Sequence, residues 1–220
     1  TKVNVKIDAA HAGVVNNNYL FYTPKALQYG SSSLNKFYKP LQKKHYDKTL
    51  GYIYKSNYVE TNTESPHYLK IINSKTPKES SKAVKAYLKS KDYKNNPRGF
   101  GVLIADAVLH DAEKIKSLKS KDTGTVSIAG GSEKAYCSIC DGMIAECGHT
   151  LGSRYGSETC IAIIADELEL DHISFETIPA NWETKSLIIA DSQLMGKLEL
   201  TTIEGQTMKL TLDAFKESLG

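Results

Sequence analysis

The sequence predicts an α+β fold in which strands outnumber helices. Short segments rich in β-branched and aromatic residues recur along the chain, and only a few segments combine helical spacing with capping residues. Strands and helices do not alternate regularly, so we expect no parallel sheet built from strand–helix–strand units. At 220 residues, of which 40% are hydrophobic and 24% charged, the chain is long enough to bury a substantial core.

Strands are predicted where apolar and polar residues alternate, or where β-branched and aromatic residues cluster. The alternation at residues 3–7 gives the first strand. The others, in chain order, are residues 19–22, 51–54, 58–59, 101–109, 124–131, 161–164, 173–178, 186–189 and 198–203.

Helix starts are marked by capping residues and by proline at the first helical position. Threonine followed by proline begins two helices, at residues 23–24 and 76–77. In the second, Glu79 completes a capping box ahead of a lysine-rich amphipathic segment. Asp111 is placed to cap a short third helix, and we expect residues 212–219 to close the chain as a helix.

Charge and hydropathy argue against two classes of protein. The 28 basic and 25 acidic residues give a net charge of +3, too small a surplus to indicate a nucleic-acid partner. No apolar run approaches the roughly 20 residues that cross a bilayer, so we expect no membrane partner. The lysine-rich helix lies in residues 61–97, which we interpret as a surface insertion in one domain that spans residues 1–220.

All four cysteines lie close together in the sequence, with a histidine among them. The candidate metal ligands are Cys137, Cys140, Cys147, His149 and Cys160. A tetrahedral zinc site needs four nitrogen or sulfur ligands, so five candidates compete for four places and the spacing leaves the choice open. A thiolate-rich site is usually closed to water, and clustered cysteines do not resemble a disulfide framework. We therefore expect a structural zinc ion in an insert at residues 137–160.

Ser127 lies in a β-branched strand that ends at a pair of glycines. A serine acts as a nucleophile only when a base takes its proton and donors hold the developing oxyanion. The six histidines that could serve as the base are His11, His45, His67, His110, His149 and His172. Spacing alone does not choose among them, and a serine that only forms hydrogen bonds across the sheet is the structural alternative.

Four segments, taken in order, carry a resemblance to a known family. They are KPL at residues 39–41 ahead of His45, TVSI at residues 125–128, CSICDG at residues 137–142 and HISFETIPAN at residues 172–181. They resemble motifs of the prohead maturation proteases of tailed bacteriophages, serine proteases related in fold to the herpesvirus assembly proteases. Residues 1–36 and 185–220 carry little of the resemblance.

The resemblance implies that Ser127 is the nucleophile and His45 the general base. His172 occupies the position where the family usually has a glutamate, and the herpesvirus relatives use a second histidine as the third member. We therefore expect His172 to orient His45, with Glu176 and Asp171 as alternatives. Backbone N–H groups near residues 128–130, or the guanidinium of Arg154, would hold the oxyanion.

The fold that the resemblance implies is α+β, with a mainly antiparallel, barrel-like β core, a few peripheral helices and a small zinc-binding insert. The implied function is a serine endopeptidase that cleaves the major capsid protein, at its delta or scaffold segment, and itself during capsid assembly. It would act inside the phage procapsid in the host cytoplasm, and a homodimer is compatible with it. The alternatives are a non-enzymatic zinc-bearing binding module of the virion and an inactive protease used as a scaffold.

Overall fold

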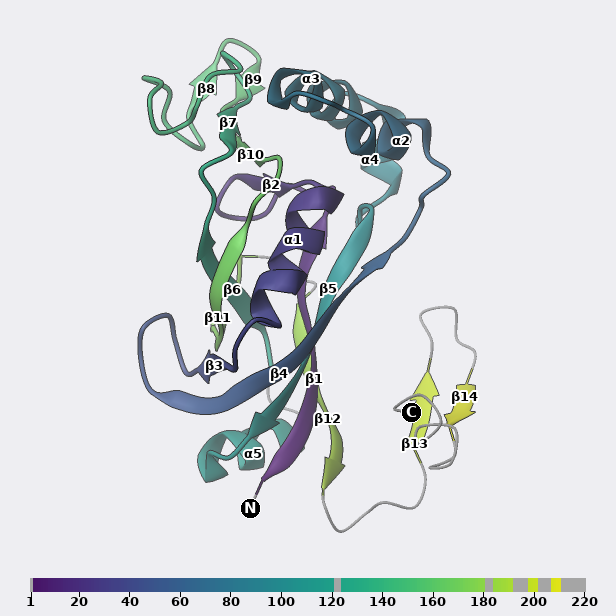
Figure 1. The fold of residues 1–220 in the computed structure, drawn as a ribbon, viewed down its shortest axis with the longest axis vertical. Helices are drawn as coiled ribbons and strands as arrows, with labels where there is room; N and C mark the ends of the chain where they lie inside the picture. The colour runs from purple at the N-terminus through teal and green to yellow at the C-terminus, as the bar shows by residue number, and fades with distance from the viewer. Residues whose placement is uncertain (1, 121–123, 181–183, 192–197, 202–206, 211–220) are drawn as a thin grey trace.

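A curled sheet of seven strands forms the centre of the fold (Figure 1). The computed structural model describes residues 2–120, 124–180, 184–191, 198–201 and 207–210. Within the sheet the strands follow the order β12-β1-β5-β4-β3-β11-β6. Their bounds are Val3–Ala12 (β1), Lys39–Gln42 (β3), Thr49–Glu60 (β4), Gly101–Leu109 (β5), Val126–Gly131 (β6), Glu169–Phe175 (β11) and Lys185–Asp191 (β12).

Antiparallel pairing dominates this sheet, and only β3 and β11 run parallel as neighbours within it. The curl brings β6, at one edge, into contact with β1 near the other edge. The sheet is thus a half-barrel, which confirms the predicted α+β class with a barrel-like core. The two predicted strands at residues 51–54 and 58–59 are one strand, β4, whose pairing with β5 shifts between Ile53 and Lys55.

The inner face of the sheet is apolar because its strands alternate in burial. In β5, for example, Leu103, Ala105, Ala107 and Leu109 are fully buried, while the residues between them are partly exposed. Helix α1 (Pro24–Leu34) packs against this face. It begins as predicted, with Pro24 in the first turn and the Thr23 hydroxyl accepting a hydrogen bond from the Ala26 N–H at 3.2 Å.

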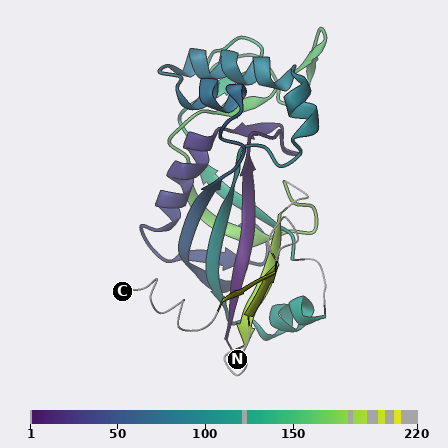
Figure 2. The same cartoon turned by 90° about the vertical axis from the view of Figure 1, so that its right-hand side faces the viewer.

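A second lobe covers one end of the sheet. It contains helices α2 (Pro66–Ile72), α3 (Pro77–Leu88) and α4 (Lys91–Asn95), and a small sheet in the order β2 (Leu20–Tyr22), β10 (Ala162–Ile164) and β7 (Ala135–Cys137). Figure 2 shows these helices gathered at the end of the molecule far from the N-terminus. Their buried faces form a second core around Phe21, Tyr87 and Phe100.

The remaining elements are short. Asp111 caps helix α5 (Ala112–Lys119) as predicted, and the hairpin of β8 (Arg154–Tyr155) and β9 (Glu158–Thr159) lies in the cysteine-containing insert. Strand β13 (Leu198–Thr201) pairs with β14 (Thr207–Leu210). The predicted helix at residues 212–219 lies outside the described residues. None of the helices in the described ranges is long and apolar enough to span a membrane.

Candidate functional site

Strands β11 and β6 place three polar side chains on the outer face of the half-barrel. Ser174 of β11 is directly opposite Ser127 of β6, and His172 is opposite Ala129. Val126, next to Ser127, is fully buried in the main core, so the alternation of the strand turns Ser127 to the other face. Ser127, Ser174 and His172 therefore share one surface.

His45 reaches this surface from the loop between β3 and β4. The loop is closed by a hydrogen bond from the Lys43 N–H to the Lys48 carbonyl at 2.9 Å, and the Gln42 side chain accepts the Tyr46 N–H at 2.8 Å. Because β3 is the parallel neighbour of β11, this loop lies beside His172.

The two histidines form a pair. Nδ1 of His45 lies 2.9 Å from Nε2 of His172, so one ring donates a hydrogen bond to the other. His172 is only 2% exposed, and the Tyr46 ring packs edge-on against it with a centroid separation of 5.0 Å. Burial lowers the pKa of His172, and the neighbouring His45 lowers it further. The inner histidine is therefore held in its neutral form.

Ser174 of β11 and Glu176, which follows the strand, also contact His45. The Ser174 hydroxyl lies 3.0 Å from His45 Nδ1 and 2.7 Å from Glu176 Oε1. Glu176 Oε1 also accepts the backbone N–H of His45 at 3.0 Å. Ser174 was not predicted as a site residue, although Ser174 and Glu176 lie two apart in the predicted strand at residues 173–178 and His172 immediately precedes it, a spacing that places all three on one face of an extended segment.

Ser127 is close to this network without being bonded to it. Its side chain is 4% exposed, and its hydroxyl forms no hydrogen bond with any residue that the structure describes. Strand β11 lies between β6 and β3, so Ser127 and His45 do not come from neighbouring strands; Ser174 lies between them. Ser127 also lines a cavity of about 10 Å³ that it shares with His11 of β1, in the seam of the half-barrel.

The alternative third members differ in position. Glu176 Oε1 lies 3.7 Å from His45 Nε2, whereas Asp171 is exposed and forms no described hydrogen bond with His45. Arg154 lies on β8 at the far end of the molecule from β3 in Figure 1, so its guanidinium is not placed to hold an oxyanion at Ser127. Gly130 lets β6 approach β11, because a Cβ atom there would lie 2.1 Å from the Glu169 carbonyl.

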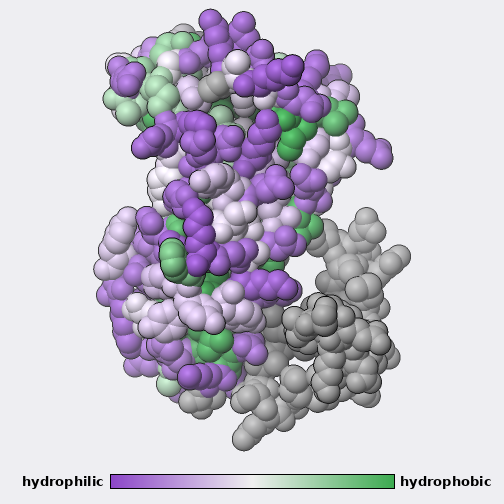
Figure 3. All heavy atoms as spheres, viewed as in Figure 1, coloured by the Kyte–Doolittle hydropathy of each residue, from purple (hydrophilic) through white to green (hydrophobic). Residues whose placement is uncertain are grey.

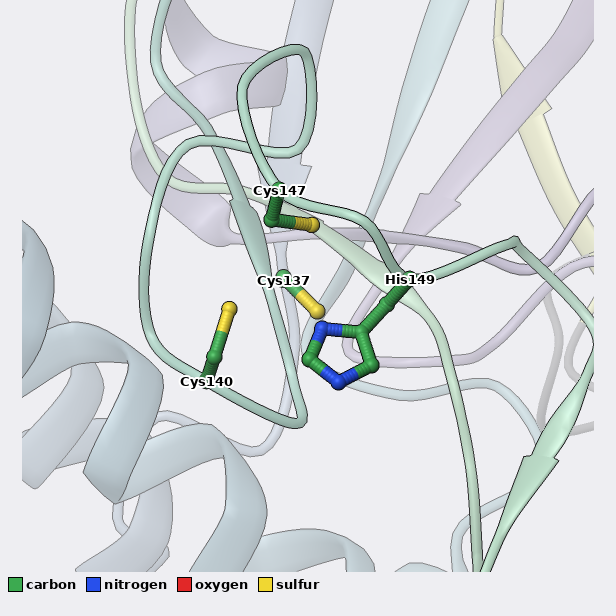
Figure 4. A group of neighbouring side chains, drawn as sticks. All are labelled: Cys137, Cys140, Cys147 and His149. Atoms are coloured by element: carbon green, nitrogen blue, oxygen red, sulfur yellow. The ribbon is translucent and has the colours of Figure 1, made fainter.

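The insert at residues 137–160 forms a second candidate site, a group of cysteine and histidine side chains. Cys137, Cys140, Cys147 and His149 have ligand atoms that all lie within 4.8 Å of one another, and they could hold a metal ion (Figure 4). Cys137 ends strand β7, and the other three follow in the loop after it. The His149 ring points toward Cys137 in Figure 4, and its Nδ1 is buried without a hydrogen-bond partner. An unpartnered ring nitrogen facing thiols fits a metal ligand.

The turn after β7 prepares Cys137 for this role. Burial alone would raise the pKa of the Cys137 thiol, but backbone N–H groups of Cys140 and Ile139 outweigh it and lower the pKa. The Ile139 N–H lies 3.4 Å from Cys137 Sγ. Asp141, with φ of 61°, continues the turn, and its carboxylate binds Lys85 of α3 at 2.6 Å, which ties the insert to the helical lobe.

Cys160, the fifth candidate, is buried beside the cluster and outside the group of four. Its Sγ lies 3.7 Å from Cys137 Sγ. Burial raises the pKa of Cys160 to about 12, with a further contribution from Cys137. The structure thus brings together four of the five predicted ligands and leaves Cys160 next to one of them.

No protein-family model matches the chain, and no curated protein or solved structure is similar to it at a significant level. The support for a function therefore comes from the geometry of the two sites and from the four sequence motifs.

Proposed function

We propose that the chain is a serine endopeptidase in which Ser127 is the nucleophile, His45 the general base and His172 the residue that orients His45. The observation that carries this proposal is the 2.9 Å contact between His45 Nδ1 and His172 Nε2, beside the strand on which Ser127 lies. A histidine held at one ring nitrogen keeps the other available to take a proton, which is what a catalytic base requires.

Ser127 lies opposite a residue that contacts His45. Directly opposed residues of antiparallel strands have Cβ atoms about 4.5–5.5 Å apart, and Ser174, opposite Ser127, already contacts the His45 ring. Catalytic hydrogen bonds are often longer in the free enzyme and tighten around the substrate. The proposal requires Nε2 of His45 to reach the Ser127 hydroxyl when the substrate is bound.

The reaction then proceeds through an acyl-enzyme. Nε2 of His45 takes the hydroxyl proton of Ser127 as the serine oxygen bonds to the scissile carbonyl carbon, and backbone N–H groups near residues 128–130 hold the oxyanion. His45 returns the proton to the leaving amine as the C–N bond breaks. A water molecule repeats the two steps on the ester and frees the serine.

The substrate class follows from the motifs. Their order resembles that of prohead maturation proteases, so the proposed substrates are the delta or scaffold segment of the major capsid protein and the chain itself, inside the procapsid. The test incubates the purified chain with the capsid precursor and resolves the products by mass spectrometry. We expect a few discrete fragments and no cleavage of an unrelated unfolded protein; an intact precursor would contradict the proposal.

For the insert, we propose a structural zinc ion held by Cys137, Cys140, Cys147 and His149. Three thiols and one imidazole supply four soft or borderline ligands, which suits zinc and leaves no open position for water. Bound zinc would supply folding free energy to a segment that has only two-residue strands of its own. It takes no part in the proposed reaction.

Acid is expected to lower the free energy of unfolding by protonating His172. Because the pKa of His172 is lowered from 6.5 in the folded chain, its contribution to stability is complete above about pH 6.5 and is lost as the pH falls from there toward the folded pKa. His172→Gln removes this dependence. We expect the free energy of unfolding, measured in urea from pH 4 to 8, to fall more steeply with acid in the wild type than in the variant. Equal slopes would show that His172 is not held neutral.

A second candidate function is a non-enzymatic binding module, and one observation favours it. Residues 66–98, which form the helical lobe, contain nine basic and two acidic residues, although the whole chain carries only +3. Hydrophilic residues cover most of the visible face of this lobe in Figure 3. Such a concentration of lysine attracts the phosphates of nucleic acids.

This alternative makes a separate prediction about salt. Lys78→Glu together with Lys82→Glu should weaken binding of a fluorescent DNA duplex and flatten its salt dependence, while Ser127→Ala leaves binding unchanged. Each lost phosphate contact reduces the slope of log K against log salt by about 0.9. Fluorescence anisotropy between 50 mM and 200 mM salt measures this slope for the wild type and for the variant. Undetectable DNA binding by the wild type would rule this alternative out.

A further inference from the structure

Ser174 and Glu176 form hydrogen bonds with His45 and with each other. The proposed triad of Ser127, His45 and His172 gives these hydrogen bonds no role. Ser174 is fully buried on β11, and its hydroxyl lies within hydrogen-bonding distance of both the His45 ring and the Glu176 carboxylate. Side chains with no task on the outer face of a sheet are usually solvated, so a buried hydroxyl that joins a base to a carboxylate calls for a reason.

The direction of each hydrogen bond follows from what each group can donate. A carboxylate only accepts, so the Ser174 hydroxyl gives its single hydrogen to Glu176 Oε1 at 2.7 Å. The Ser174 oxygen is then an acceptor for the His45 ring, and Nδ1 is the nearer nitrogen, at 3.0 Å against 3.4 Å for Nε2. A hydrogen on Nδ1 serves both acceptors beside it, the Ser174 oxygen and Nε2 of His172 at 2.9 Å, and it leaves Nε2 of the neutral His45 ring able to accept a proton.

Glu176 also places a negative charge beside the base. Its Oε1 anchors the loop by accepting the His45 backbone N–H at 3.0 Å, and it lies 3.7 Å from His45 Nε2. His172, in contrast, is buried and neutral and supplies no charge to the imidazolium that forms when His45 takes a proton. A nearby carboxylate stabilises that imidazolium.

We propose that Ser174 and Glu176 are positioning residues that fix the Nδ1–H tautomer of His45 and supply the negative charge that His172 lacks. This inference rests on the proposed protease function, because it assigns a role within the same site. Both residues act through His45 rather than on the substrate. The titratable side chains that contact or face the His45 ring in the described part of the chain are His172, Glu176 and Tyr46.

The first test measures His45 directly, in a chain that cannot cleave. Histidine resonances are followed by NMR in the Ser127→Ala background as the pH is varied. Glu176→Gln, which keeps the shape and removes the charge, should weaken the preference for the Nδ1–H tautomer, because the Ser174 hydroxyl loses its carboxylate acceptor. Ser174→Ala should replace the single Nδ1–H tautomer by a mixture, and Ser174→Thr, which keeps the hydroxyl, should restore it.

A matched control and a kinetic readout separate positioning from folding. Glu169→Gln changes a carboxylate of β11 that binds Lys36 rather than His45, so the His45 tautomer should stay unchanged. With Ser127 intact, Glu176→Gln should lower kcat about tenfold, leave KM unchanged and move the acid limb of the kcat profile to lower pH. A merely structural role would not move that limb.

An unchanged acid limb of the kcat profile in Glu176→Gln together with an unchanged tautomer in Ser174→Ala would overturn the inference. If Ser174→Ala fails to fold, Glu176→Gln decides the matter alone, because glutamine closely preserves the shape of glutamate. The NMR shifts do not depend on cleavage. A chain that shows them and cuts no precursor would contradict the protease proposal while leaving the network in place.

Discussion

Replacing Ser127 by alanine is expected to abolish cleavage of the capsid precursor while the chain stays folded. The substitution removes one oxygen from a side chain that forms no described hydrogen bond, so the fold loses little. The reaction loses its nucleophile, and we expect the rate to fall by at least about 10³-fold. Fragment yield by mass spectrometry and the thermal midpoint of unfolding measure the two effects separately.

His45→Ala should reduce cleavage about as much as Ser127→Ala, and the double variant should be no worse than either. Residues that act as one catalytic unit are not additive, so a further loss in the double variant would show that they act independently. Ser132→Ala is the matched control, because this nearby hydroxyl binds the Asp166 carbonyl and lies outside the network. Cleavage that survives in Ser127→Ala would show that Ser127 is not the nucleophile.

Loss of the metal is expected to have the largest effect on stability. Cys140→Ser combined with Cys147→Ser removes two of the four grouped ligands, and we expect one equivalent of zinc to be lost. A metal present at about 1,000 times its dissociation constant stabilises the fold by about 4 kcal/mol. For a chain of this size that corresponds to about 8–16 °C in the thermal midpoint. Metal analysis and a thermal melt with and without a chelator make the measurement.

Cys160 provides the control for the metal site. Cys160→Ala should lower stability by the cost of a small buried cavity and should keep one equivalent of zinc, because Cys160 lies outside the group of four. His149→Ala should lose the metal. The opposite outcome, with zinc lost on changing Cys160 and retained on changing His149, would reverse the ligand assignment.

Local sequence signals predicted the helix caps well. Thr23, Thr76 and Asp111 each accept a backbone N–H at the start of a helix, because capping depends only on neighbouring residues. The same signal was present and missed at Ser65, where serine followed by proline begins α2 within the predicted insertion at residues 61–97. The helix predicted to begin after residue 76 is α3, which ends at Leu88 in the structure. Ser90 then caps a separate helix, α4.

Long-range contacts set the limit of prediction for the site. The resemblance to a known family pointed to His45 and His172, and the structure brings them to hydrogen-bonding distance. That contact depends on the parallel pairing of β3 with β11, and no local pattern fixes the pairing of segments so far apart. Ser174 was missed for the same reason, because its role depends on the His45 ring that the loop between β3 and β4 places against it. Likewise, spacing offered five metal ligands, and only the fold separates Cys160 from the others.

Labelling with a fluorophosphonate probe shows whether Ser127 is a nucleophile, because the probe phosphonylates activated serine hydroxyls. We predict one adduct per chain, located on Ser127 by peptide mapping, that is lost in His45→Ala and retained in Ser132→Ala. A chain that forms no adduct, or one whose Ser127 is labelled equally well without the imidazole of His45, would contradict the account.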